Sequence, residues 1–113
     1  MPRLNIKVTV INDEETQEFI TNAIIQDEIL KYKERDNTTV IYDYKNNSLF
    51  RENNELRMDY SFNSGKGNIF IKGLNKKLNI KIKTKKIERK INIIEIEYVI
   101  ENNNFLYKVE EIK

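Results

Sequence analysis

Two stretches in the later part of the chain, residues 78–85 and 94–101, alternate apolar side chains with charged or polar ones. Neighbouring side chains point to opposite faces in a β-strand, so this two-residue period predicts two half-buried strands. We expect an antiparallel hairpin that turns near Lys90. Such a turn pairs Ile82 with Tyr98 and Thr84 with Ile96 on the buried face, and Lys83 with Glu97 and Lys85 with Glu95 on the exposed face. A slip by one residue would bury the lysines, so the pattern should specify the register.

Most of the remaining chain divides into short alternating runs separated by polar turn residues. Further strands are expected at residues 4–10, 38–44, 48–51, 56–62, 69–71 and 105–112, with turns rich in Asn and Asp between them. The connections are too short for parallel crossovers, so the strands should form an antiparallel meander. The sequence therefore predicts an all-β fold, a small antiparallel up-and-down β-barrel of about 8–10 strands in which closure removes the exposed sheet edges.

Residues 16–35 fit two interpretations. Apolar residues recur at helical spacing, as in the pairs Phe19/Ala23 and Ile20/Ile24. The same residues also form two strands, 17–25 and 28–34, joined by a turn at Gln26 and Asp27. The local pattern leaves both open, and the alternative fold class is α+β with a helix within residues 14–35.

Composition narrows the range of functions. The 113 residues suit one domain, residues 1–113, and include neither cysteine nor histidine. A chain without these residues has no disulfide, no thiol nucleophile and no histidine base, so we expect a protein that is not an enzyme and uses no cofactor or metal. The lack of cysteine also makes a reducing, cytoplasmic location the simpler assumption. No apolar run approaches the length of a membrane-spanning helix.

Several strand segments also carry a resemblance to a known family. Residues 32–34 (Tyr-Lys-Glu), 38–40 (Thr-Thr-Val), 49–51 (Leu-Phe-Arg), 78–87 and 97–98, together with the final strand, resemble the YwiB-like bacterial proteins of the domain family DUF1934. The resemblance implies a calycin-like, or lipocalin-like, β-barrel, and strands across residues 16–35. It implies no activity, because the family has none established. Where the family tends to place Thr-Pro-aromatic-Gly, this chain has residues 73–76, Gly-Leu-Asn-Lys.

A barrel of this size has room for its own side chains or for one small ligand. Several polar side chains fall on the predicted apolar faces, and the resemblance also places an arginine at Arg51. If Arg51 and Glu34 point inward they should pair, because an unpaired buried charge is costly. The predicted ligand-binding residues, for a small apolar or amphipathic molecule, are Tyr32, Glu34, Arg51, Tyr60, Thr84 and Tyr98. The other interpretation is a solid core with tyrosines at its ends and Arg51 at the rim.

Charge is unevenly distributed along the chain. Residues 66–90 include ten Lys or Arg and a single acid, Glu88, although the whole chain has a formal net charge of only +2. The stretch Lys72–Lys90 could therefore bind nucleic acid or an acidic protein through Lys81, Lys83 and Lys85. The opposing interpretation is a solvated strand face whose lysines pair with glutamates. The nearly neutral total argues against nucleic acid.

Overall fold

The computed structural model describes residues 3–90 and 93–112 and contains eleven strands. They are β1 (Arg3–Asn12), β2 (Thr16–Gln26), β3 (Ile29–Lys33), β4 (Thr39–Asp43), β5 (Ser48–Glu52), β6 (Leu56–Ser61), β7 (Lys66–Ile71), β8 (Lys76–Lys81), β9 (Lys83–Lys90), β10 (Ile93–Ile100) and β11 (Asn103–Glu111). A 3-10 turn, Lys72–Leu74, joins β7 to β8, and these described ranges contain no α-helix. The all-β prediction is confirmed, and the α+β alternative with a helix within 14–35 is wrong.

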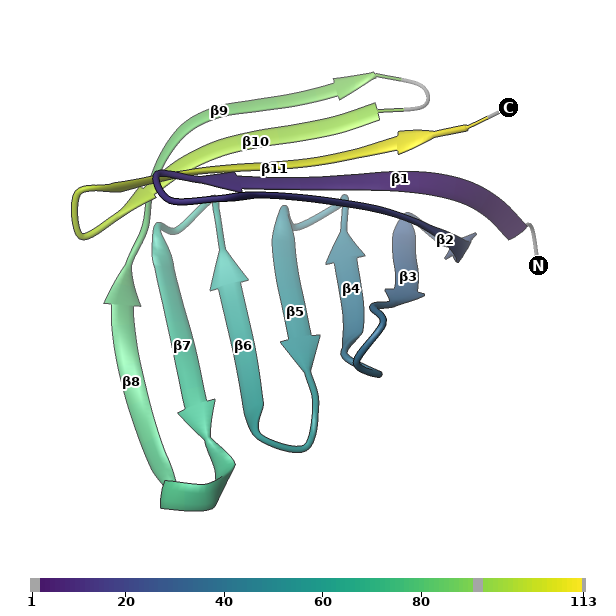
Figure 1. The fold of residues 1–113 in the computed structure, drawn as a ribbon. Helices are drawn as coiled ribbons and strands as arrows, with labels where there is room; N and C mark the ends of the chain where they lie inside the picture. The colour runs from purple at the N-terminus through teal and green to yellow at the C-terminus, as the bar shows by residue number, and fades with distance from the viewer. Residues whose placement is uncertain (1–2, 91–92, 113) are drawn as a thin grey trace.

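The strands form one antiparallel sheet in the order β8-β7-β6-β5-β4-β3-β2-β1-β11-β10-β9. The sheet folds over itself into two layers that cross, with β9, β10, β11, β1 and β2 above and β3 to β8 below (Figure 1). The result is the predicted antiparallel barrel, nearly but not fully closed. The eleventh strand arises because the predicted strand 78–85 is divided at Ile82 between the two layers.

Residues 16–35 show why their local pattern was ambiguous. Both faces of β2 carry apolar side chains: Ala23 is buried in the core, while Ile20 on the opposite face is 69% exposed. Apolar residues on both faces of a strand imitate the spacing of a helix. The turn between β2 and β3 falls at Asp27 and Glu28, one residue later than predicted, and both residues have positive φ angles of 53° and 65°.

The chain passes from β8 in the lower layer to β9 in the upper layer at Ile82, which forms a corner of the barrel. The Ile82 amide donates to the Gly65 carbonyl at 2.8 Å, and the Thr84 hydroxyl donates to the Phe62 carbonyl at 2.9 Å. The Ile82 side chain is 5% exposed. The bend is therefore attached to the β6–β7 turn by hydrogen bonds and anchored in the core.

The register predicted for the central hairpin is wrong. Tyr98 faces Thr84 and Ile96 faces Ile87, with an irregularity in β9 between these pairs. Because Thr84 is even-numbered and Ile87 odd-numbered, an extra residue is needed to keep both on the inner face. The predicted turn near Lys90 borders residues 91–92, which lie outside the described residues, and Lys90 itself pairs with Ile93.

The shifted register places Glu88 opposite Glu95 on the outer face. Two like charges in this position would repel each other. Lys86 lies between them, with its Nζ 3.0 Å from Glu88 and 3.2 Å from Glu95. Lysines and glutamates therefore pair on this face as predicted, but Glu95 pairs with Lys86 and not with Lys85.

The inward side chains of the two layers form one core. Its buried members are Ile6, Val8, Ala23, Leu30, Tyr32, Val40, Tyr42, Leu49, Tyr60, Phe62, Ile82, Ile94, Ile96, Tyr98, Tyr107 and Val109. The inward direction of Ile82, Ile94, Ile96 and Tyr98 follows the alternation seen in the sequence. Burial of each large aliphatic side chain contributes about 1.5–3 kcal/mol.

Gly65 provides a test of the corner at Ile82. Its φ is +70°, and an added Cβ would lie 2.8 Å from the Ile82 carbonyl oxygen. We predict that Gly65→Ala lowers the free energy of unfolding by about 1–3 kcal/mol, because the substitution strains the backbone. The matched control is Gly73→Ala, where a Cβ would meet nothing within 4 Å. Equal urea midpoints for the two variants would contradict this account of the corner.

Candidate functional site

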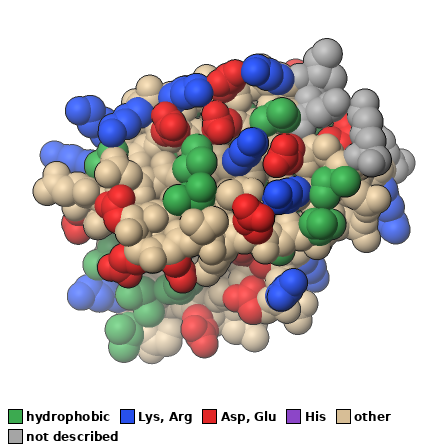
Figure 2. All heavy atoms as spheres, turned by 45° about the horizontal axis from the view of Figure 1, so that its top comes forward, with side chains coloured by type: hydrophobic (Ala, Val, Ile, Leu, Met, Phe, Trp, Pro, Cys, Tyr) green, Lys and Arg blue, Asp and Glu red, His purple; other side chains and the backbone are tan. Residues whose placement is uncertain are grey.

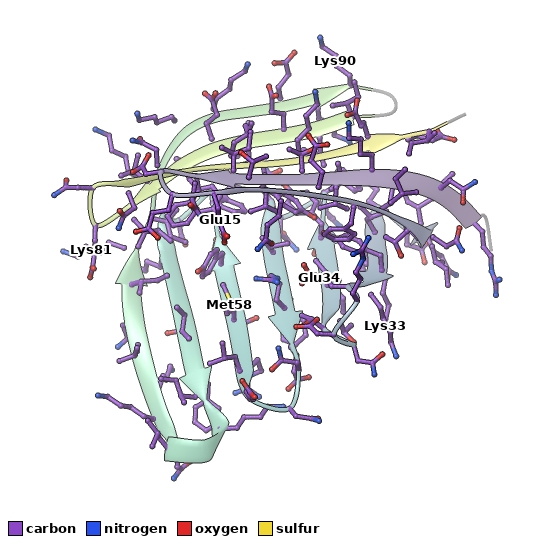
Figure 3. The ribbon with its side chains drawn as sticks, viewed as in Figure 1. Glu15, Lys33, Glu34, Met58, Lys81 and Lys90 are labelled. Atoms are coloured by element: carbon purple, nitrogen blue, oxygen red, sulfur yellow. The ribbon has the colours of Figure 1, made fainter. Side chains whose placement is uncertain are left out.

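The barrel is open beside the first half of β2. β1 pairs with β2 from Thr16 to Ile24, whereas β3 pairs only with Ala23 to Gln26. The layers separate there and leave a cleft of about 750 Å³. Figure 3 shows Glu15, Glu34 and Met58 below β1 and β2, and all three residues line this cleft. An inner chamber of about 70 Å³ extends the cleft to the rings of Tyr32 and Tyr107.

The apolar walls of the cleft come from both layers. Val10, Phe19, Tyr98 and Phe105 lie on the upper layer, and Met58 and Tyr60 on the lower. Tyr98 stacks on Phe105 with ring centroids 5.1 Å apart and an angle of 10° between the rings, and it meets Tyr60 edge-on at 6.2 Å. These contacts hold the Tyr60 and Tyr98 rings in place at the bottom of the cleft.

An ion pair joins Glu34, which follows β3, to Arg51 in β5. Arg51 Nε donates to Glu34 Oε1 at 3.1 Å, and Nη2 donates to the same oxygen. Arg51 Nη1 faces the Met58 sulfur at 3.9 Å. The side chains are 37% and 15% exposed. Burial alone would lower the pKa of Arg51, but the hydrogen bond and the charge of Glu34 raise it on balance. The predicted inward pairing of these residues is present.

The tyrosine hydroxyls around the cleft differ in their partners. Those of Tyr32 and Tyr107 hydrogen-bond to each other at 2.7 Å. Those of Tyr60 and Tyr98 have no hydrogen-bond partner among the described residues, although the two residues are only 7% and 6% exposed. None of the described buried side-chain oxygens is both fully shielded and unpaired. The Tyr60 and Tyr98 hydroxyls therefore reach the open volume, where a ligand or water can bind them.

The structure brings together five of the six predicted ligand-binding residues. Tyr32, Glu34, Arg51, Tyr60 and Tyr98 line the cleft or its inner chamber. Thr84 is not among the lining residues. Its hydroxyl instead donates a hydrogen bond to the Phe62 carbonyl at the corner next to Ile82.

Sequence reasoning missed Gln17, Met58 and Phe105. The alternation places Met58 on an inner face, but only the pairing of β2 with β3 shows which part of that face remains uncovered.

A second groove, of about 580 Å³, lies along β5 to β8, lined by Phe50, Asp59, Lys66 and Lys81 among others. Lys66 and Lys81 are exposed, and they face each other across β7 and β8. The groove follows a single sheet layer, and its lining includes neither the Glu34–Arg51 ion pair nor Tyr98. We therefore take the cleft between the layers as the candidate site.

The basic stretch Lys72–Lys90 does not form one face. Lys81 ends β8 in the lower layer, whereas Lys83 and Lys85 belong to β9 in the upper one. Figure 3 shows Lys81 and Lys90 on well-separated parts of the molecule, and Figure 2 shows acidic side chains intermixed with basic ones on the face that it presents. Lys85 donates to Asn104 at 3.3 Å, and Lys72 pairs with Glu52. The nucleic-acid or acidic-protein interpretation remains a prediction.

Among residues 3–90 and 93–112, no group of three or more acidic side chains is placed to hold a metal ion. No helix in this part of the chain is long and apolar enough to cross a membrane.

The Glu34–Arg51 pair can be tested by a double-mutant cycle. We predict that Glu34→Gln and Arg51→Met each lower the free energy of unfolding by about 1–3 kcal/mol, because each leaves a half-buried charged or polar group without its partner. The double variant should lose less than the sum of the two, with a coupling energy of about 0.5–3 kcal/mol. The exposed Lys7–Glu18 pair, with an N–O distance of 3.5 Å, is the control and should couple by about 0.2–1 kcal/mol. Additive losses at residues 34 and 51 would contradict the pairing.

Burial raises the pKa of every tyrosine above the ordinary value of 10.0. The six are Tyr32, Tyr42, Tyr44, Tyr60, Tyr98 and Tyr107. Because the unfolded chain releases these protons near pH 10 and the folded chain does not, the stabilisation is complete below that pH and declines as the pH rises above it.

Alkaline titration followed by ultraviolet absorbance should therefore show tyrosinate appearing only above pH 10, and the tyrosinates of Tyr32, Tyr42, Tyr98 and Tyr107 should appear together with loss of the fold. Ionisation of all six tyrosines near pH 10 with the fold intact would contradict this prediction.

The fold has a counterpart among known structures. No protein-family model matches the sequence, and no curated protein matches it significantly. The crystal structure of the ywiB protein from Bacillus subtilis is similar to this chain with a TM-score of 0.59 and 19% sequence identity, and the match covers 98% of this chain and 91% of that one. The chain therefore has the fold of the ywiB protein, as the resemblance to YwiB-like proteins implied.

Proposed function

We propose that the protein binds a small amphipathic molecule in the cleft between the layers and catalyses no reaction on it. The observation that carries the proposal is the pair of tyrosine hydroxyls, of Tyr60 and Tyr98, that reach the cleft without a partner among the described residues, although each residue is buried as a whole. Each hydroxyl can donate a hydrogen bond to a molecule in the cleft or accept one from it.

The composition of the walls supports an amphipathic ligand. Small-molecule sites are mostly apolar concave volumes of roughly 300–1,000 Å³ with a few convergent polar groups. The cleft, at about 750 Å³, has this character: Val10, Phe19, Met58 and Phe105 offer apolar contact, while polar groups gather around Glu34 and Arg51. The inner chamber of about 70 Å³ can take only a few atoms of a ligand.

The side chains around the cleft favour binding over catalysis. The chain has no histidine or cysteine to act as base or nucleophile near neutral pH. Glu34 Oε1 accepts two hydrogen bonds from Arg51, so this oxygen is already engaged within the protein.

The finer parts of the proposal rest on the sequence. We place the protein in the DUF1934 family of YwiB-like bacterial proteins and its barrel among the calycin-like, or lipocalin-like, barrels, on the strand segments that carry the resemblance. We also place it in the cytoplasm, in keeping with the absence of cysteine.

Filling the cleft tests the proposal. The uncharged fluorescent probe N-phenyl-1-naphthylamine should bind the wild-type protein with an increase in emission. We predict that Met58→Trp weakens this binding by at least about tenfold, a loss of about 1.4 kcal/mol, because the indole occupies the cleft.

Asp59→Trp places the same indole at the neighbouring residue of β6, which lies outside the cleft, and this variant should bind the probe like the wild type. Urea unfolding would verify that both variants fold. No probe binding by the wild-type protein, or equal binding by the two variants, would refute the site.

A further inference from the structure

The residues that line the cleft carry more negative than positive charge. Three carboxylates, those of Glu15, Glu34 and Asp36, outnumber two guanidinium groups, those of Arg35 and Arg51. Glu18 also borders the cleft, but it shares the outer face of β2 with the exposed Ile20, and its carboxylate pairs with Lys7 at 3.5 Å. A concave site with low-dielectric walls concentrates the field of its charges, so this excess attracts cations and repels anions.

Arg51 does not reverse this balance. Its Nε and Nη2 both donate to Glu34 Oε1, and its Nη1 faces the Met58 sulfur. An anionic head group that approached Arg51 would also approach the Glu34 carboxylate, which is 15% exposed and accepts from the same guanidinium. The pair therefore presents no net positive charge to a ligand.

The aromatic side chains of the cleft also favour a cation. Phe19, Tyr60, Tyr98 and Phe105 all line it. The face of an aromatic ring attracts an ammonium or quaternary ammonium group, by about 0.5–1 kcal/mol at exposed sites and by about 2 kcal/mol when desolvated. Ring faces give no such attraction to a carboxylate.

The unused hydrogen-bonding groups match an ammonium head. The hydroxyl oxygens of Tyr60 and Tyr98 have no partner among the described residues, and these side chains are more than nine-tenths buried. At Glu34, both hydrogen bonds from Arg51 end on Oε1. An ammonium group has three N–H donors and no acceptor, so two phenolic oxygens and a carboxylate oxygen are suitable acceptors for it.

We infer that the cleft binds an amphipathic cation, an apolar molecule with an amine head that is protonated at neutral pH. This inference rests on the proposed function, because it specifies the ligand of the same cleft. The apolar part packs against Met58, Phe19 and Phe105. The ammonium group lies among the tyrosine hydroxyls and the carboxylates.

Three ligands with the same chain and different heads test the inference. Octylammonium, octanol and octanoate would compete with N-phenyl-1-naphthylamine at pH 7 and low ionic strength, each below its aggregation concentration. We expect octylammonium to bind at least about tenfold more tightly than octanoate, with octanol between them, and sodium chloride to reduce the difference. Octanoate that binds as well as or better than octylammonium would overturn the inference.

The outcomes separate the two proposals. If the probe binds and the three ligands compete equally, or if none of them competes, the cation inference fails and the binding site stands. If neither the probe nor any of the three ligands binds the wild-type protein, the proposed function fails and the inference fails with it.

A charge variant links the preference to the cleft. Glu15→Gln should weaken octylammonium binding by about two- to threefold and leave octanol binding unchanged. Glu15 is exposed, so the fold should tolerate the change. The matched control, Glu55→Gln, removes the same charge from an exposed position outside the cleft. Equal losses in the two variants would overturn the assignment of the cation to this cleft.

Discussion

The barrel depends on how the chain turns at Ile82. The segment from Lys76 to Lys90 belongs to both layers, because it pairs with β7 before the bend and with β10 after it. The Ile82 amide keeps a hydrogen bond to Gly65, and its side chain is buried with those of Phe62 and Tyr98. A strand that changes layers in this way closes one corner of the barrel. The opposite corner is closed by the β2–β3 hairpin, so both layers cover the same core.

The sequence predicts the faces of the strands better than their partners. Strict alternation assigns Ile82, Ile94, Ile96 and Tyr98 to the interior, since a change of face would expose apolar area and bury charge. Alternation does not reveal that the strand bends at Ile82. The only local sign of the irregularity in β9 is that the inward positions change from even-numbered at Thr84 to odd-numbered at Ile87. A register predicted from uninterrupted alternation does not include this irregularity, and it differs from the observed register by two or three residues.

The alternation of inward and outward side chains also made part of the candidate site predictable. Tyr32, Tyr60 and Tyr98 fall on inner faces by alternation, and the cost of an unpaired buried charge predicts that Arg51 and Glu34 pair if they point inward. The position of the opening depends on the lengths of neighbouring strands. β2 has eleven residues and β3 has five, so β3 leaves the first half of β2 without a neighbour on that side. No local pattern contains that information, and Met58, Gln17 and Phe105 were missed as a result.

The opening also explains why polar groups can persist inside so small a barrel. A fully closed interior would bury the Glu34–Arg51 pair and four tyrosine hydroxyls, and each unpaired group would destabilise the fold. Tyr32 and Tyr107 pair with each other beside the small inner chamber. Tyr60, Tyr98 and Arg51 lie closer to the opening, where water or a ligand can complete their hydrogen bonds. An apolar substitute at each of these positions would pack a barrel of this size without that requirement. The polar groups therefore make the cleft suited to recognising a ligand, at the expense of a continuous apolar core.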